Sequence, residues 1–107
     1  MTAVTTHVLD TARGVPAAGV QVVLEAYGRD GWLPLVRAVT DEDGRASDLA
    51  AADAAAGLHR LVFATGAYLG EGAFFPEVTV AFEVGGQERL HVPLLLSPFG
   101  YSTYRGS

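Results

Sequence analysis

The segment Val20-Gln21-Val22-Val23-Leu24-Glu25-Ala26-Tyr27 has an apolar residue at every second position. In an extended chain its even-numbered residues lie on one face, whereas Gln21 and Glu25 lie on the other. The same period of two recurs in two later stretches, at Val78, Val80, Phe82 and Val84 and at Leu90, Val92, Leu94 and Leu96. An amphipathic helix would instead repeat its apolar residues three or four positions apart. The pattern predicts half-buried strands and an all-β fold, with these apolar residues turned inward.

Turn-forming residues separate the expected strands. Gly28-Arg29-Asp30-Gly31 predicts a hairpin turn that leads into a strand at 32–40. Asp41-Glu42-Asp43-Gly44 predicts the next turn, because Asp and Gly tolerate the positive φ that tight turns need. Further strands are expected at 5–10, at 58–64 and at 101–104. About seven or eight strands at this spacing suit a two-sheet sandwich.

Two stretches lack the strand pattern. Residues 49–57 are mostly Ala and fit either a short helix or a loop, since Ala favours helix but so short a piece cannot stand alone. Residues 65–70 fit a single helical turn ahead of Phe74-Phe75-Pro76. The expected architecture is therefore a β-sandwich with very little helix.

Size and composition restrict the classes of function. The 107 residues fit one domain spanning 1–107, and the absence of cysteine excludes disulfides and thiolate metal sites. The net charge of −5 comes without the basic patch that nucleic-acid binding needs. Met1-Thr2-Ala3-Val4 does not begin a signal peptide, and no apolar stretch is long enough for a membrane span. We expect a soluble, cytoplasmic protein, whose 50% hydrophobic content favours apolar surface buried between subunits.

Strand parity places two histidines on outward faces. If the alternating apolar residues of the last long strand face the core, His91 faces outward with Pro93 and Leu95, which would suit a shared interface or a pocket. From the pattern alone a surface histidine is the simpler interpretation, because exposed imidazoles are common. His7 shares a face with Thr5, and taken alone it too is more often structural than catalytic.

Arg45 and the C-terminal tail are the remaining candidates. An arginine after a turn is usually just solvated, but the paired donors of Arg45 would suit an anion clamp if the fold brings it near the histidines. Sequence spacing does not decide this. The tail at 97–107 fits either a final edge strand or a segment that delivers Tyr104, Ser107 and the chain-end carboxylate into a site. No phosphate loop, nucleophile elbow or zinc-type spacing is present.

Four short motifs mark the chain from one end to the other. They are Thr6-His7-Val8-Leu9-Asp10-Thr11, Asp43-Gly44-Arg45, His91-Val92-Pro93-Leu94-Leu95 and Tyr104-Arg105-Gly106-Ser107. Together they resemble the 5-hydroxyisourate hydrolases of the transthyretin-related family, as does Phe74-Phe75-Pro76-Glu77-Val78, and the resemblance covers essentially the whole chain. The Tyr-Arg-Gly-Ser ending is the most specific motif, because it distinguishes the hydrolases from transthyretin, the hormone carrier on the same fold.

The resemblance implies a fold, an assembly and a reaction. The fold is a transthyretin-like two-sheet sandwich of about eight strands with one short helix, assembled as a homotetramer with active sites in the channel between dimers. The reaction is hydrolysis of 5-hydroxyisourate to 2-oxo-4-hydroxy-4-carboxy-5-ureidoimidazoline in urate degradation, without a metal or organic cofactor. The family's catalytic residues carry over onto His7, Arg45, His91 and Ser107, and substrate binding onto His7, Arg45 and Tyr104. Arg105 belongs to the matching motif but receives no chemical step.

Two features depart from the family pattern. Leu90 stands where a Tyr is common, and because parity places Leu90 inward, we expect a change in core packing and no lost catalytic group. The Ala-rich segment 50–56 also differs from many relatives, which bears on loop structure only.

Two other functions stay open. The first is a non-catalytic transthyretin-like protein that binds a small ligand in the same channel, although a carrier has no need for two histidines beside a guanidinium. The second is a structural or adhesive β-sandwich domain, which a monomer in sizing chromatography would favour.

Overall fold

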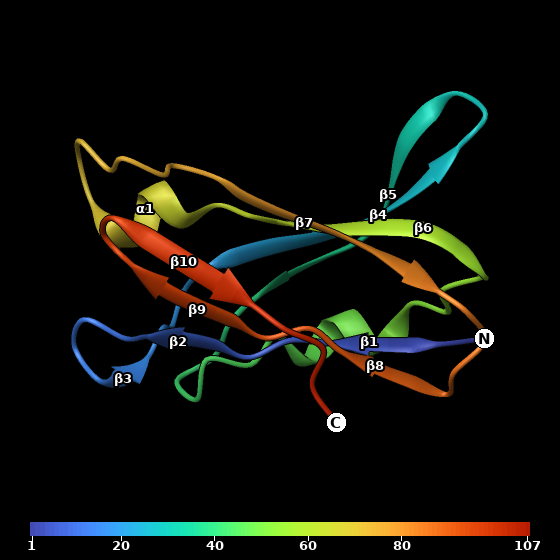
Figure 1. Cartoon of the computed structure of the whole chain (residues 1–107), viewed down its shortest axis with the longest axis horizontal. Coiled ribbons are helices and arrows are strands. Elements are labelled where there is room, and N and C mark those ends of the chain that lie inside the picture. The colour runs from blue at the N-terminus through green and yellow to red at the C-terminus, as the bar shows by residue number, and fades with distance from the viewer.

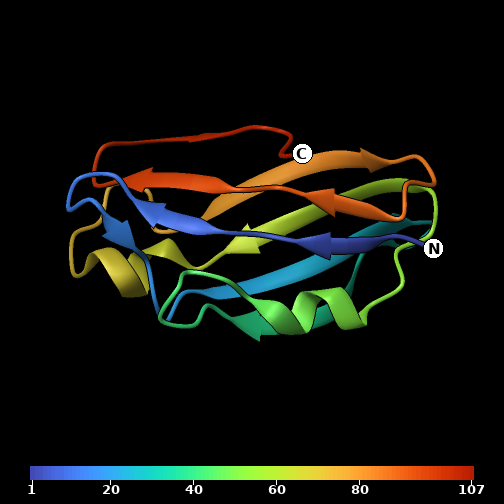
Figure 2. The same ribbon diagram turned by 90° about the horizontal axis from the view of Figure 1, so that it is seen from below.

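The computed structural model describes all residues from 1 to 107. Its strands are β1 (Ala3–Thr5), β2 (Val8–Asp10), β3 (Val15–Pro16), β4 (Gln21–Gly28), β5 (Gly31–Val39), β6 (Gly57–Phe63), β7 (Val78–Val84), β8 (Arg89–His91), β9 (Leu94–Ser97) and β10 (Gly100–Thr103). The helix α1 spans Thr65–Leu69, and a 3₁₀ helix spans Ser47–Ala51. The strands form two layers packed face to face (Figures 1 and 2), which confirms the all-β sandwich with one short α-helix.

One layer is the antiparallel sheet β5-β4-β6-β7. Its first hairpin turns between Gly28 and Gly31, as the sequence predicts, and the end of this hairpin projects beyond the body of the sandwich (Figure 1). Val22 and Leu24 of β4 are fully buried, which confirms the inward face of that strand. Along β7 only the two ends, Val78 and Val84, are fully inside, because β7 is an edge strand.

The other layer is built on two long parallel segments from opposite ends of the chain. β1 and β2 run end to end beside β8 and β9, which also run end to end (Figure 2). The residue offset is 86 on both sides of the break, since Val4 pairs with Leu90 (90 − 4) and Val8 with Leu94 (94 − 8). Backbone hydrogen bonds continue across the break. β3 and β10 then extend this layer at its two edges.

The core lies between the two layers and draws on nearly every strand. Leu90, Val92, Leu94 and Leu96 are all buried, as parity predicts. Leu90 packs in the core cluster, in agreement with its expected inward position. Pro93, expected on the outward face with His91 and Leu95, is also buried, and Thr103 Oγ1 of the returning tail donates a hydrogen bond of 2.7 Å to its carbonyl.

The two helical segments are short. The 3₁₀ helix begins before the Ala-rich stretch and is anchored by the fully buried Leu49. Within residues 49–57 the rest is irregular, so both sequence-based readings hold in part. The single turn expected at 65–70 is α1. Neither segment has the length or apolarity needed to cross a membrane.

At the end of β2, away from the break between β1 and β2, the buried acid Asp10 joins this strand to α1. Tyr68 of α1 donates a hydrogen bond of 2.7 Å to Asp10 Oδ2, while Asp10 Oδ1 accepts from the amides of Ala12 and Arg13. Burial alone would raise the pKa of Asp10. These hydrogen bonds and the charge of Arg13 outweigh that effect, so the pKa lies below its ordinary value of 3.8.

Tyr68→Phe is expected to lower the free energy of unfolding by about 1.5–3 kcal/mol at neutral pH, the range for a hydrogen bond to a charged group. A lowered folded-state pKa stabilises the fold above the unfolded pKa, and this stabilisation is lost as pH falls through the folded value. The difference between variant and wild type should therefore shrink well below pH 3.8. Urea unfolding at neutral pH and well below pH 3.8 measures this difference in the free energy of unfolding. Tyr27→Phe is the matched control, because Tyr27 is exposed.

Candidate active site

Two histidines lie on one face at the break in the parallel strands. Thr5 pairs directly with His91, and Thr5 and His7 project from the same side of their strand because side chains alternate. His7 and His91 are therefore diagonal neighbours on one sheet surface. The backbone continues through the break, since Val92 N–H donates to Thr5 O at 2.9 Å and Leu94 N–H to His7 O at 3.0 Å. Both histidines therefore lie on a continuous ladder of backbone hydrogen bonds.

The turn at residues 41–44 brings Arg45 to the histidines. Gly44 has a φ of +77°, and a Cβ on it would lie 2.4 Å from the Val8 carbonyl oxygen. Because of this close approach, Val8 N–H donates a hydrogen bond of 2.7 Å to Gly44 O. His7 and Arg45 pair beside it in an isolated antiparallel β-bridge. This long-range packing contact places Arg45 beside His7, which sequence spacing alone does not decide.

The ring of His7 has a defined tautomer. Its Nε2 lies 2.8 Å from the backbone carbonyl oxygen of Asp43. A carbonyl oxygen only accepts hydrogen bonds, so Nε2 carries the hydrogen and Nδ1 is the nitrogen left for other partners. The same turn therefore orients His7 and positions Arg45.

The ring of His91 lies between Thr5 and the tail. Its Nδ1 is 2.8 Å from Thr5 Oγ1, and Gly106 N–H donates to the His91 carbonyl at 2.8 Å. A Cβ on Gly106 would lie 2.5 Å from His91 Cδ2, so only glycine fits against the ring there. Burial, the positive charge of Arg45 and the neighbouring His7 lower the pKa of His91 below its ordinary 6.5. His91 is therefore a neutral imidazole near pH 7.

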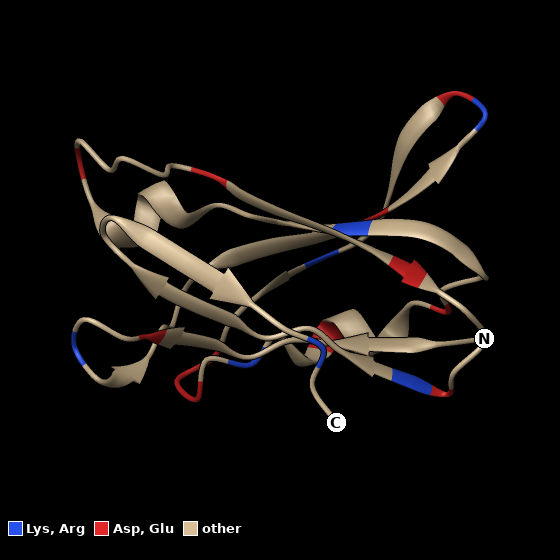
Figure 3. Cartoon of the chain, viewed as in Figure 1, with Lys and Arg blue, Asp and Glu red and all other residues tan.

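A polar cleft of about 350 Å³ opens in front of these groups. It is lined without any hydrophobic side chain, by Thr5, Arg45, Arg89, His91, Gly106 and Ser107. No Asp or Glu side chain is among them. Basic segments lie on β8 and beside the C-terminus (Figure 3), in a chain whose net charge is −5. The cleft is thus suited to a small anion.

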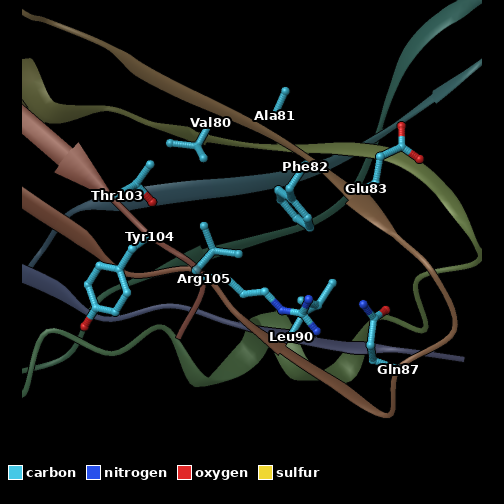
Figure 4. Close-up of a pocket in the computed structure, with 10 residues that line it drawn as sticks. Val80, Ala81, Phe82, Glu83, Gln87, Leu90, Thr103, Tyr104 and Arg105 are labelled. Carbon is cyan, nitrogen blue, oxygen red and sulfur yellow. The ribbon is translucent and has the colours of Figure 1, made fainter. Parts of the chain in front are cut away.

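The five residues expected at the site are only partly brought together. Arg45, His91 and Ser107 line the cleft, and His7 lies beside Arg45. Tyr104 is 56% exposed and lines a separate cavity of about 320 Å³ with Arg105 and residues of β7, where it points away from them (Figure 4). In the single chain, Tyr104 is therefore outside the cleft.

Two side chains of the cleft, those of Thr5 and Arg89, are additions to the sequence-based set. Strand parity could have found both, since Thr5 is two residues from His7 and Arg89 is two residues from His91. No group of three or more His, Cys, Asp or Glu side chains is placed to hold a metal ion. Two imidazoles, a guanidinium and a hydroxyl can move protons and stabilise an oxyanion.

Comparisons with known proteins show the family and the solved structures that this chain resembles. The model of the HIUase/Transthyretin family matches residues 4–106. The 5-hydroxyisourate hydrolase of Salmonella dublin is 49% identical over 106 residues, which cover 94% of this chain and 78% of the relative. The solved structure of Klebsiella pneumoniae 5-hydroxyisourate hydrolase superposes with a TM-score of 0.87 at 37% identity, covering 100% of both chains. Sea bream transthyretin in complex with thyroxine gives a TM-score of 0.87 at 30% identity, covering 96% and 93%.

Proposed function

The chain belongs to the HIUase/Transthyretin family, and from this we propose that it is an enzyme that hydrolyses 5-hydroxyisourate in urate degradation. One observation carries the proposal beyond the family. Arg45, His91 and Ser107 line a single polar cleft, and His7 is held beside Arg45. The product would be 2-oxo-4-hydroxy-4-carboxy-5-ureidoimidazoline, formed by opening the six-membered ring at a lactam.

Water activation is the first step that the histidines would perform. Water is a poor nucleophile toward an amide-like carbonyl, and an imidazole that is neutral at the working pH can accept its proton. The water oxygen then bonds to the carbonyl carbon as a histidine takes the proton. When the carbon–nitrogen bond breaks, the ring nitrogen receives a proton from a histidine, so no cofactor has to supply or remove electrons.

Arg45 would hold the anionic substrate and stabilise the negative charge that develops on the carbonyl oxygen. Ser107 lines the same cleft and would orient substrate or water by hydrogen bonding. Tyr104 is 56% exposed outside the cleft, so its contact with substrate would need movement of the tail or a second subunit.

A homotetramer with its active sites between dimers is part of the proposal. Large hydrophobic side chains stay exposed on the single chain, among them Leu33, Phe74, Phe99 and Tyr101. Surface of this kind supports burial between subunits. Sizing chromatography with light scattering measures the assembly, and a monomer would instead favour a structural or adhesive domain.

A small-ligand carrier is the second candidate function, favoured by the similarity to sea bream transthyretin. Small-molecule pockets are mostly lined by apolar side chains with a few polar ones. The cleft at His91 has no hydrophobic side chain, and it holds ionisable groups that an apolar ligand would leave unpaired. This lining supports the hydrolase.

An ultraviolet assay tests the proposed function. Urate oxidase generates 5-hydroxyisourate in the cuvette, and the protein is added while the absorbance of the intermediate is followed. Hydrolase activity will make the intermediate disappear much faster than its spontaneous decay. Decay at the spontaneous rate would reject the enzyme and turn attention to ligand-binding measurements.

Arg45→Ala should lower kcat/KM by about 10²- to 10³-fold, the usual cost of removing one donor that stabilises an oxyanion. The same assay measures it. Arg29→Ala is the matched control, because Arg29 is exposed in the hairpin turn between β4 and β5. Rate constants near wild type for Arg45→Ala would remove Arg45 from the mechanism.

A further inference from the structure

The three histidines differ in what holds their rings. His7 Nε2 faces the carbonyl of Asp43, and His59 Nδ1 faces the carbonyl of Gly57 at 3.0 Å. Carbonyl oxygens only accept, so these two contacts fix the hydrogen on the nitrogen that they face. His91 alone is held by a hydroxyl, that of Thr5, which can either donate or accept. The role that Thr5 plays therefore decides the chemistry of His91.

The Thr5–His91 contact is built into the fold. The two residues are direct partners in the parallel pair β1–β8, so the strand register sets the 2.8 Å separation between Thr5 Oγ1 and His91 Nδ1. On its other edge the ring meets Gly106, whose hypothetical Cβ would lie 2.5 Å from Cδ2. The ring therefore packs against the tail on that edge.

The remaining nitrogen of His91 is open to the cleft. His91 Nε2 makes no hydrogen bond within the chain, and yet no buried side-chain nitrogen or oxygen lacks a partner. Nε2 is consequently accessible, and His91 lines the cleft. Any proton that His91 exchanges with a bound water or substrate passes through Nε2.

We propose that Thr5 is a positioning residue that accepts the hydrogen of His91 Nδ1 and thereby leaves Nε2 as the proton acceptor in the cleft. This inference rests on the proposed hydrolase function. Its chemical advantage is that one hydrogen bond serves both protonation states. When Nε2 takes a proton from water, Nδ1–H stays bonded to Thr5 Oγ1, whereas the opposite tautomer would lose that bond on protonation. His91 is then the general base, and Thr5 has the orienting role that a carboxylate fills in catalytic triads.

The tautomer can be measured directly and independently of activity. Long-range ¹H–¹⁵N spectra of the full-length labelled protein distinguish the protonated nitrogen of each neutral ring. We expect Nδ1–H for His91, with His7 (Nε2–H) and His59 (Nδ1–H) as internal references. In Thr5→Val the His91 signals should move toward Nε2–H, because Val keeps the β-branched shape and removes the acceptor. Thr5→Ser should retain the wild-type pattern.

Kinetics give the second readout. Thr5→Val should lower kcat about tenfold, the value of one ordinary hydrogen bond, with KM within a factor of about two. Thr5→Ser should restore most of the loss. Two results would overturn the role of Thr5 and leave the hydrolase function standing. One is a His91 ring with its hydrogen on Nε2 in the active wild type, and the other is an unchanged kcat in Thr5→Val. An inactive wild type would reject the hydrolase function, while the spectra would still decide the tautomer.

Discussion

His91→Ala is expected to lower kcat by about 10²- to 10⁴-fold, the range that a positioned general base contributes. His91 is the histidine that lines the cleft, and its ring is fixed by Thr5 and Gly106. The ultraviolet assay with urate oxidase measures the loss. Added imidazole should restore part of the rate, because it can occupy the space left by the ring.

The pH dependence gives a second reading of the same variant. A base must be unprotonated, and the pKa of His91 lies below 6.5 because of burial, the charge of Arg45 and the neighbouring His7. Below that pKa the wild-type rate should fall, and above it the rate should be level. The rate of His91→Ala should not show this fall at low pH. A variant that keeps both its rate and this fall at low pH would exclude His91 as the base.

Gly106→Ala should lower kcat by about 10²-fold, the cost that a misplacement near 1 Å can have. The new Cβ would lie 2.5 Å from His91 Cδ2, so either the ring or the tail must move. Ser107 would move with the tail, and the cleft would lose two of its walls at once. Steady-state kinetics measure the effect, and circular dichroism should show an unchanged fold.

Gly100→Ala is the matched control for Gly106→Ala. It lies in the same tail, and its Cβ would meet only Ser97 Oγ at 3.8 Å, an ordinary contact. We expect wild-type kinetics from Gly100→Ala. An equal loss of kcat in the two variants would mean that any added methyl group in the tail lowers the rate. The contact between Gly106 and His91 would then not be the cause.

Much of the fold follows from local patterns in the sequence. The period of two predicts the buried residues of 20–24 and 90–96, whereas Ala26 is only half-buried, and the turn residues predict the hairpin at 28–31. Parity also predicts that His7 shares a face with Thr5, as observed. These features are local because alternation and turn geometry depend on neighbouring residues only.

The site depends on contacts between distant segments, which local patterns do not contain. Arg45 reaches His7 because Gly44 packs on the backbone of Val8, and the burial of Pro93 depends on the returning tail. The roles proposed for Arg45 and Ser107 come from the resemblance to a family and from no local pattern. The same resemblance implies that Tyr104 contacts substrate, and in the single chain Tyr104 lines a separate cavity.

The parallel pairing of β1–β2 with β8–β9 has a consequence for how the protein folds. Partners 86 residues apart can pair only after nearly the whole chain is available, and such non-local pairing slows folding. The antiparallel sheet β5-β4-β6-β7 is built from successive or nearby segments and can form earlier. Until the last strands arrive, the edge of β2 and the apolar Val4 and Val8 lack cover, which is a state prone to aggregation. The polar cleft is thus a late product of folding, and the chain is most exposed to aggregation before its final segment docks.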